Sequence, residues 1–178
     1  MHPGNGTLPR AGGWVAVGHS DDERADVAGA AAAAAALASA DARLLVVFCS
    51  DAYDLEALLA AIRGAAGRVP LIGCSTAGEI ATGGPGDAGV VVTALGGPRF
   101  SVSTAVSRGV AGRLRAAGAE AAASLHEIDP REHRVLMLLS DGLSGNQQEV
   151  VRGAYSVAGA SVPLVGGCAG DDLKMRTT

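Results

Sequence analysis

The chain has 178 residues, of which 48% are hydrophobic, only 3% are aromatic and 26 are glycine, and its formal net charge is −4. This apolar content excludes an intrinsically disordered chain, and the length suits one domain of ordinary size. The single lysine and the scattered arginines form no basic stripe, which argues against nucleic-acid binding. Because aromatic rings are nearly absent, we expect a core of Val, Leu and Ile with closely approaching Ala and Gly backbones.

The cysteines and the terminal segment bear on compartment and cofactors. Cys49, Cys74 and Cys168 lie far apart and form no Cys-x-x-Cys pair, so we expect neither a disulfide framework nor a zinc site. We also expect no other metal and no cofactor. Residues 1–13 lack a basic region followed by an apolar run, and we interpret them as a flexible lead. Residues 28–40 are mostly Ala and too short for a membrane span. These features predict a cytoplasmic protein without a membrane partner.

Short apolar runs alternate with helical patterns in the first half of the chain. Residues 14–18 read as a strand, and Ser20 and Glu23 read as a capping box that begins a helix reaching to about residue 40. The continuous apolar run at 43–49 is typical of a strand covered on both faces. The predicted elements after the first helix are strands at 43–49, 70–74 and 89–95, and a helix at 54–66.

The same alternation continues in the second half. After a turn at 96–98, alternating residues predict a strand at 100–106. The elements predicted next are helices at 109–127 and 146–158, the latter capped by Asn146 and Glu149, and strands at 134–139 and 163–166. Alternating strands and helices indicate an α/β fold with a largely parallel sheet and helices on its faces. The short turn at 96–98 favours a hairpin and therefore a mixed sheet.

Landmarks of the first half recur in the same order in the second half. The matching pairs are Ser50-Asp51 with Ser140-Asp141, Pro70-Leu71 with Pro163-Leu164, and Gly78-Glu79 with Gly170-Asp171. This order predicts one β-α-β-α-β unit used twice, with repeat 1 at about 14–95 and repeat 2 at about 99–178. Repeat 2 lacks a partner for the strand at 89–95. We therefore expect a C-terminally incomplete domain with an open sheet edge, through which homo-oligomers could form.

Small polar and acidic residues follow several predicted strands. Parallel α/β sheets bind ligands at the carboxyl ends of their strands, which makes these residues candidates for a binding site. The candidates are Ser50, Asp51, Cys74, Ser75, Thr76, Glu79, Ser140, Asp141, Asp171 and Asp172. Carboxylates bind an ammonium group, and loop amides bind an anion, so the set suits a small zwitterion. The competing interpretation is that such residues are only caps and turn formers. Asp141, Glu79 and Asp171 are the strongest candidates because no obvious cap needs them.

Two other functions stay open at this point. No complete enzyme motif is present, and Glu79 stands where a phosphate-binding loop requires lysine. A small α/β enzyme would use a strand-end Asp, or Cys74 as nucleophile with His19 as base if the fold brings them within hydrogen-bond reach. The third hypothesis is a purely structural or dimerising domain.

Three stretches resemble the N-terminal domain of the FIST family. They are GCSTAGEI at 73–80, LLSDGLSGNQQEVVRGAY at 138–155 and VPLVGGCAGDDLKMRTT at 162–178, and the similarity extends over nearly everything from Trp14 onward. The resemblance implies a sensory domain of a signal-transduction protein that binds a small ligand such as an amino acid. It implies no settled catalytic residues. It also implies a FIST C-terminal domain and signalling output domains as partners in the complete protein.

Overall fold

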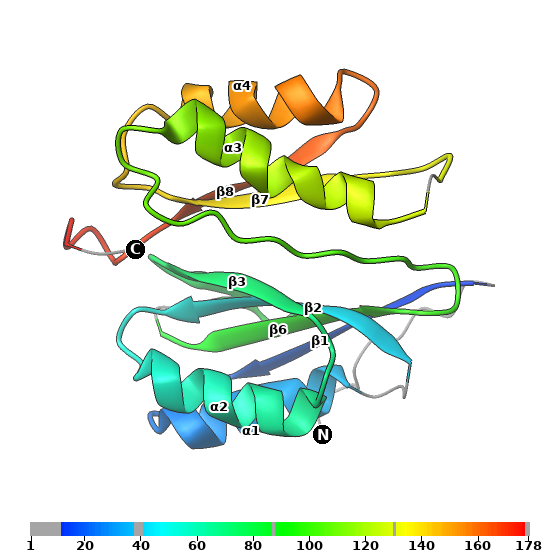
Figure 1. The fold of residues 1–178 in the computed structure, drawn as a ribbon. Helices are drawn as coiled ribbons and strands as arrows, with labels where there is room; N and C mark the ends of the chain where they lie inside the picture. Colours follow the sequence, from blue (N-terminus) through cyan, green and yellow to red (C-terminus); the bar gives the residue numbers. More distant parts are fainter. Residues whose placement is uncertain (1–11, 38–40, 87, 130, 177–178) are drawn as a thin grey trace. The chain divides into compact units, whose positions relative to one another are not determined.

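The computed structural model describes residues 12–37, 41–86, 88–129 and 131–176. Of the predicted lead, residues 1–11 lie outside the described residues. The chain forms two compact units. The first unit contains the described residues up to Phe100 together with Asp171–Met175, and the second contains Ser101–Gly170 with Arg176. Figure 1 labels the helices and strands of both units.

A four-stranded mixed sheet forms the first unit, with strand order β1-β6-β2-β3. Its strands are β1 (Trp14–Ser20), β2 (Ala42–Ser50), β3 (Leu71–Thr76) and β6 (Val90–Gly96). β2 and β3 are parallel, whereas β6 runs antiparallel to both β1 and β2. The predicted α/β class and mixed sheet are therefore confirmed. The mixed character arises because β6 inserts between β1 and β2, and not because a hairpin forms at 96–98.

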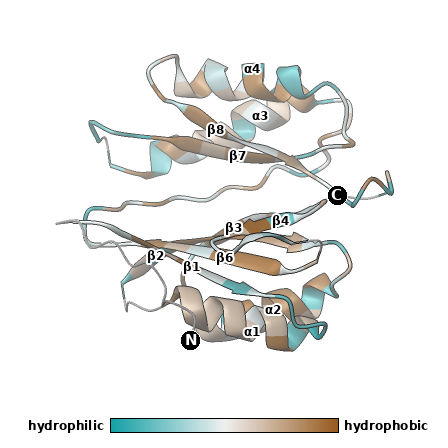
Figure 2. Cartoon of the chain, turned by 180° about the vertical axis from the view of Figure 1, so that it is seen from behind, coloured by the Kyte–Doolittle hydropathy of each residue, from teal (hydrophilic) through white to brown (hydrophobic). Residues whose placement is uncertain are grey.

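Two helices, α1 (Ala25–Ala36) and α2 (Leu55–Ala66), cover one face of this sheet. The core between them contains small residues of α1, larger residues of α2 and one face of the central strands; among these are Ala28, Ala32, Leu45, Val47, Leu58, Ile62 and Val92. The helices cross closely, since a Cβ added to Gly29 would lie 2.7 Å from the Leu58 carbonyl oxygen. Figure 2 shows the apolar colouring of these packed elements. Ala and Gly thus provide close backbone approach in place of large rings.

A short hairpin follows β3. It consists of β4 (Glu79–Ala81) and β5 (Gly84–Gly86), which pair antiparallel. Gly78, just before it, has a φ of 148°, a backbone conformation that side chains disfavour. This turn directs the chain from β3 straight into the hairpin, so that Glu79 begins β4.

The second unit contains a parallel pair of strands and two helices. Its elements are α3 (Leu114–Ala122), the 3₁₀ helix η1 (Ala123–Glu127), β7 (Leu136–Asp141), α4 (Gln147–Ala158) and β8 (Leu164–Ala169). β7 and β8 are parallel and form a two-stranded sheet. α3 and α4 approach closely, because a Cβ on Gly118 would lie 2.0 Å from the Val150 carbonyl oxygen. The small core gathers Ala122, Leu125, Leu136, Ala154 and Val162.

The strand predicted at 100–106 is wrong. Residues 101–110 have no regular secondary structure. Side chains tie this segment to its own unit instead, since Ser103 Oγ donates to Glu127 Oε2 and Ser107 Oγ donates to Glu120 Oε2. Alternating polar and apolar residues indicate a strand only where a partner strand completes the hydrogen-bonding ladder, and none pairs with this segment among the described residues.

The capping box predicted at Ser20 is also wrong. Ser20 ends β1, and its Oγ accepts from the N–H of Asp22. Helix α1 begins later, after Arg24, which makes no side-chain cap. The helix ends at Ala36, and the predicted end near residue 40 falls among residues outside the described ones. By contrast, Asn146 does cap α4, since its Oδ1 accepts from the N–H of Gln148.

The two units share some local features, but the duplication and the predicted repeat boundaries stay predictions.

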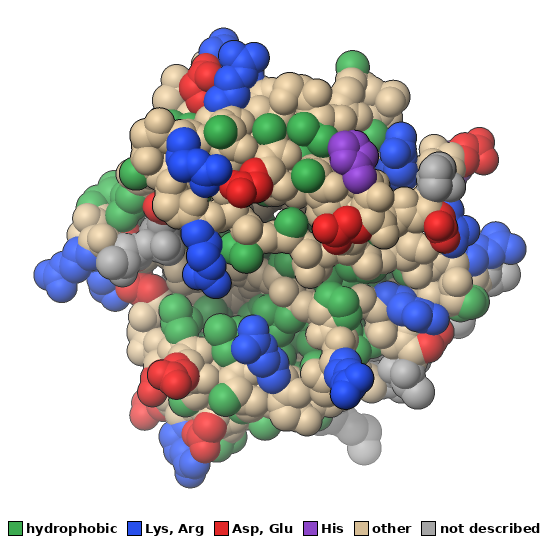
Figure 3. Space-filling view, viewed as in Figure 1, with side chains coloured by type: hydrophobic (Ala, Val, Ile, Leu, Met, Phe, Trp, Pro, Cys, Tyr) green, Lys and Arg blue, Asp and Glu red, His purple; other side chains and the backbone are tan. Residues whose placement is uncertain are grey.

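No helix in the described part of the chain is long and apolar enough to cross a membrane. Charged side chains of both signs are interspersed on the face seen in Figure 3.

Candidate functional site

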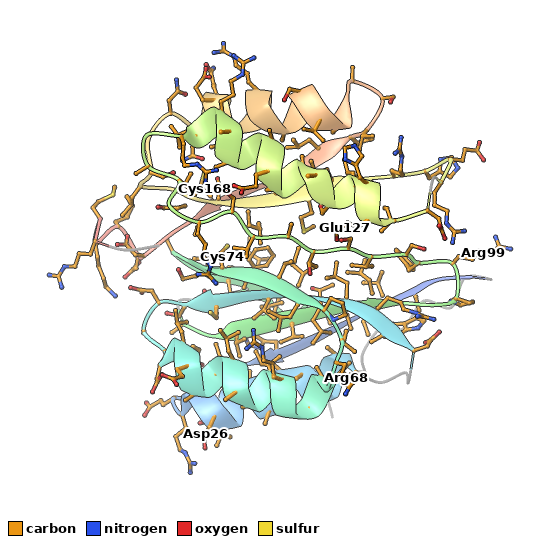
Figure 4. All side chains as sticks on the ribbon, in the orientation of Figure 1. Asp26, Arg68, Cys74, Arg99, Glu127 and Cys168 are labelled. Atoms are coloured by element: carbon orange, nitrogen blue, oxygen red, sulfur yellow. The ribbon has the colours of Figure 1, made fainter. Side chains whose placement is uncertain are left out.

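The carboxyl ends of β2 and β3 bring several predicted site residues together. In the parallel register, Ser50 lies opposite Thr76 and Cys49 lies opposite Ser75. Cys74 precedes them on β3 (Figure 4). The apolar run of β2 favours a buried central strand, and the small polar residues begin where that strand ends. One edge of the first unit therefore holds Ser50, Cys74, Ser75 and Thr76 on neighbouring strands.

Glu79 lies in this same unit and is 3% exposed. Thr76 Oγ1 donates a hydrogen bond of 2.6 Å to Glu79 Oε1. The second carboxyl oxygen, Oε2, is buried and has no hydrogen-bond partner among the described residues. Buried polar atoms are nearly always paired in native proteins, and a half-satisfied buried carboxyl group calls for a specific explanation.

The surroundings of Glu79 disfavour further negative charge. Burial, and then the charge of Glu79, raise the pKa of the Cys49 thiol to about 11. The pKa of Tyr53 is also raised, first by burial, then by Asp21 and Asp22, and less by Glu79. The Tyr53 hydroxyl donates to the Asp22 carbonyl oxygen at 2.7 Å. The thiol and the phenol therefore stay protonated at neutral pH and add no negative charge beside Glu79.

Asp51 and Asp171 have cationic or backbone partners. The Lys174 ammonium lies 2.6 Å from Asp51 Oδ2. Asp171 is buried, and its Oδ1 accepts from the N–H of Met175. Asp172 is exposed and has a positive φ of 52°. Asp171 thus supports the loop it begins. Lys174 was absent from the predicted set, although as the only lysine of an acidic chain it could have been noticed.

The other predicted residues, Ser140 and Asp141, belong to the second unit. Ser140 Oγ donates to Gln147 Oε1 at 2.8 Å and lies 3.7 Å from the sulfur of Cys168. Asp141 Oδ1 accepts from the N–H of Leu143, so this carboxylate supports the turn after β7. The Gln147 amide also donates to the Asp141 carbonyl oxygen. Gln147 was missed, because a first helical residue carries no signal for this role.

The nucleophile–base pair proposed from the sequence does not form. His19 lies opposite Val91, Val91 lies opposite Phe48, and Phe48 lies opposite Cys74. His19 and Cys74 therefore occupy the two outer strands of the sheet, three strand spacings or about 14 Å apart. That distance is far beyond hydrogen-bond reach, so His19 cannot activate the Cys74 thiol in this structure.

The described residues contain no group of three or more His, Cys, Asp or Glu side chains that could hold a metal ion. Asp51 and Asp141 lie in different units. The strongest candidate within one unit is the region around Thr76, Glu79 and Asp51.

Comparison with known proteins identifies the family. The model of the FIST N domain matches residues 43–178, which is most of the chain and contains both parallel strand pairs. No curated protein matches the sequence. FIST N domains are sensory domains of signal-transduction proteins. The match covers more than half of the sequence and agrees with the mixed α/β architecture, and this chain therefore belongs to the FIST N domain family.

Proposed function

We propose that this chain is a sensory domain that binds a small amino-acid-like ligand at the carboxyl ends of β2 and β3. The observation that carries the proposal is the buried Glu79 side chain, whose Oε2 has no partner among the described residues. A ligand ammonium group supplies three N–H donors, and charge-assisted hydrogen bonds to a carboxylate are among the strongest in proteins.

The chemistry around Glu79 favours a cation over other ligands. A buried carboxyl oxygen without a donor costs free energy, of the order of 1–3 kcal/mol in mutational data, and a bound ammonium would recover it. The neighbouring Thr76 hydroxyl already donates to Oε1, which orients the carboxyl group and leaves Oε2 as the acceptor. Asp51 lies near the same strand ends, where it can accept from the same ammonium group, and Ser75 can contact the rest of a small ligand.

A thermal-shift screen of the twenty amino acids tests this function. Binding to the native state alone stabilises it, by about 2.7 kcal/mol at one hundred times the dissociation constant. We expect at least one amino acid to raise the melting temperature of the wild-type protein by several degrees. We expect Glu79→Gln to abolish that increase, because its amide keeps an acceptor for Thr76 but has no charge for an ammonium.

Glu132→Gln is the matched control, since Glu132 is exposed in the second unit and makes the same charge change. It should leave the ligand-induced increase intact. If no amino acid raises the melting temperature of the wild-type protein, the proposed ligand class is wrong.

The proposal extends to partners and compartment. A sensory domain needs an output, and we propose a FIST C-terminal domain and signalling output domains as its partners in a cytoplasmic protein. Among the described strands β3 pairs with β2 alone and is therefore an edge strand, which offers an edge for association between copies. Light scattering coupled to gel filtration would detect such a homo-oligomer, and a mass of one chain at all concentrations would contradict it.

A further inference from the structure

The segment Asp171–Met175, called the strap below, packs with the first unit although it lies more than 70 residues beyond Phe100. It contains the only lysine of the chain. The Lys174 ammonium lies 2.6 Å from Asp51 Oδ2, directly after the end of β2. An ammonium group is therefore already bound at the strand ends, and the protein itself supplies it.

The backbone of the strap is held in an unusual conformation. Asp172, Leu173 and Met175 have φ angles of 52°, 61° and 54°, in the left-handed region that residues with a Cβ rarely adopt. Within the strap, the N–H of Lys174 donates to the Asp171 carbonyl oxygen and the N–H of Met175 donates to Asp171 Oδ1. Such conformations persist only where the surrounding contacts hold them.

We propose that the strap is a tethered competitor of the ligand. The Lys174 ammonium group forms an ion pair with the Asp51 carboxylate, and a ligand ammonium group that binds Asp51 displaces Lys174 and releases the strap. This inference rests on the proposed function, because it concerns the same strand ends. It adds a regulatory step, since ligand binding would change the conformation of residues 171–175. Release of a chain segment is a change that a partner domain can detect.

The ion pair is suited to a reversible contact. The Lys174 side chain is 45% exposed, and Asp51 is 17% exposed. Exposed ion pairs are weak and weaken further with salt. Opening the contact also frees three residues from the left-handed region, which favours the open state. A tethered group competes at an effective concentration that reaches the millimolar range for short flexible tethers. A ligand with additional contacts, such as one to Glu79, would compete at lower concentration.

A lysine-specific protease gives a direct measurement, because the sequence offers it one site, the bond between Lys174 and Met175. Cleavage requires the lysine side chain to enter the protease pocket, which excludes its ion pair with Asp51. We expect Asp51→Asn to accelerate cleavage roughly two- to fivefold, as expected for loss of one exposed ion pair. Asp21→Asn is the matched control, because Asp21 is exposed in the same unit and has no hydrogen bond or ion pair with Lys174 in the described structure. It should change the rate less.

Global unfolding is monitored separately with an arginine-specific protease, which cuts at Arg63 within α2. We expect its cleavage rate at Arg63 to be the same in wild type and in Asp51→Asn. Equal cleavage at Lys174 in wild type and Asp51→Asn would overturn the strap contact.

Competition between Lys174 and a ligand ammonium group is tested by measuring cleavage at Lys174 in the presence of methylammonium chloride or of the amino acids. Sodium chloride at equal ionic strength is the control. Faster cleavage at Lys174 in wild type, but not in Asp51→Asn, supports the inference. If an amino acid raises the melting temperature through Glu79 but leaves cleavage at Lys174 unchanged, the competition is wrong and the proposed function stands. If methylammonium accelerates cleavage but no amino acid raises the melting temperature, the strap stands and the amino-acid ligand is wrong.

Discussion

The parallel pairs β2-β3 and β7-β8 begin in the same way. In the first unit the N–H of Leu45 donates to the Pro70 carbonyl oxygen, and in the second the N–H of Leu136 donates to that of Pro163, both at 2.9 Å. Each second strand has a glycine three positions after its proline, with Gly73 opposite Val47 and Gly166 opposite Leu138. Up to this point the two pairs have equivalent registers.

The pairs differ by one residue at their carboxyl ends. Ser50 Oγ accepts from the N–H of Ala52, and Asp141 Oδ1 accepts from the N–H of Leu143, so Ser50 and Asp141 occupy the same position. The Ser-Asp dipeptides that matched in the sequence are therefore displaced by one residue. Asp51 lies beyond the strand and pairs with Lys174, whereas Asp141 ends its strand and supports a turn. Identical dipeptides in the two segments therefore do not imply identical structural roles.

A second difference lies in the segments that precede the helix pairs. β1 forms a full ladder with β6, whereas residues 101–110 form no ladder among the described residues. Both units nevertheless pack two helices together, and this shared feature allows the same substitutions to be compared in both.

The largest expected loss of stability follows from substituting the glycines at the α1–α2 and α3–α4 contacts. Gly118→Ala places a Cβ 2.0 Å from the Val150 carbonyl oxygen, and Gly29→Ala places one 2.7 Å from that of Leu58. Overpacking lowers the free energy of unfolding by about 1–3 kcal/mol and sometimes more. We therefore expect a loss of about 3 kcal/mol for Gly118→Ala and of about 1–2 kcal/mol for Gly29→Ala. Urea unfolding measures both free energies.

Gly64 in α2 is the matched control, since a Cβ there meets nothing within 4 Å. Gly64→Ala should stabilise by about 0.4–1 kcal/mol. Equal costs at Gly118 and Gly29 would show that the two helix contacts tolerate side chains alike, against the tighter approach in the second unit.

The helix caps give a smaller difference. The Asp54 carboxylate accepts from the N–H groups of Glu56 and Ala57, whereas the Asn146 side chain accepts from that of Gln148 alone. Loss of a cap costs about 0.5–2 kcal/mol. We expect Asp54→Ala to lie near the upper end and Asn146→Ala near the lower end, measured by urea unfolding. A larger cost for Asn146→Ala would reverse the order of the two caps.

The prediction with the smallest effect on stability at neutral pH concerns Cys49, which is buried in the first unit. Its pKa in the folded state is about 11, above the ordinary value of 9.0. Below pH 9 the thiol is protonated in both states, and between about pH 9 and 11 only the unfolded state loses the proton. Stability should therefore fall across this range. Cys49→Ala should remove this component of the pH dependence, whereas Cys168→Ala, which changes the exposed cysteine of β8, should retain it. An unchanged alkaline profile in Cys49→Ala would contradict the assignment.

The sequence by itself determined the α/β class, the positions of most strands and helices, the cap at Asn146 and the resemblance to the FIST family. These features depend on local patterns, such as the apolar run of β2 and the periodicity of α2. Only the tertiary structure decided which strands pair. The insertion of β6 separates His19 from Cys74, and residues 101–110 pair with no strand in the described part of the chain despite their alternating pattern. It also brought Lys174 to Asp51 and buried Glu79 beside Thr76. Periodicity records the face that a residue presents, whereas register and long-range pairing depend on which segment packs beside it.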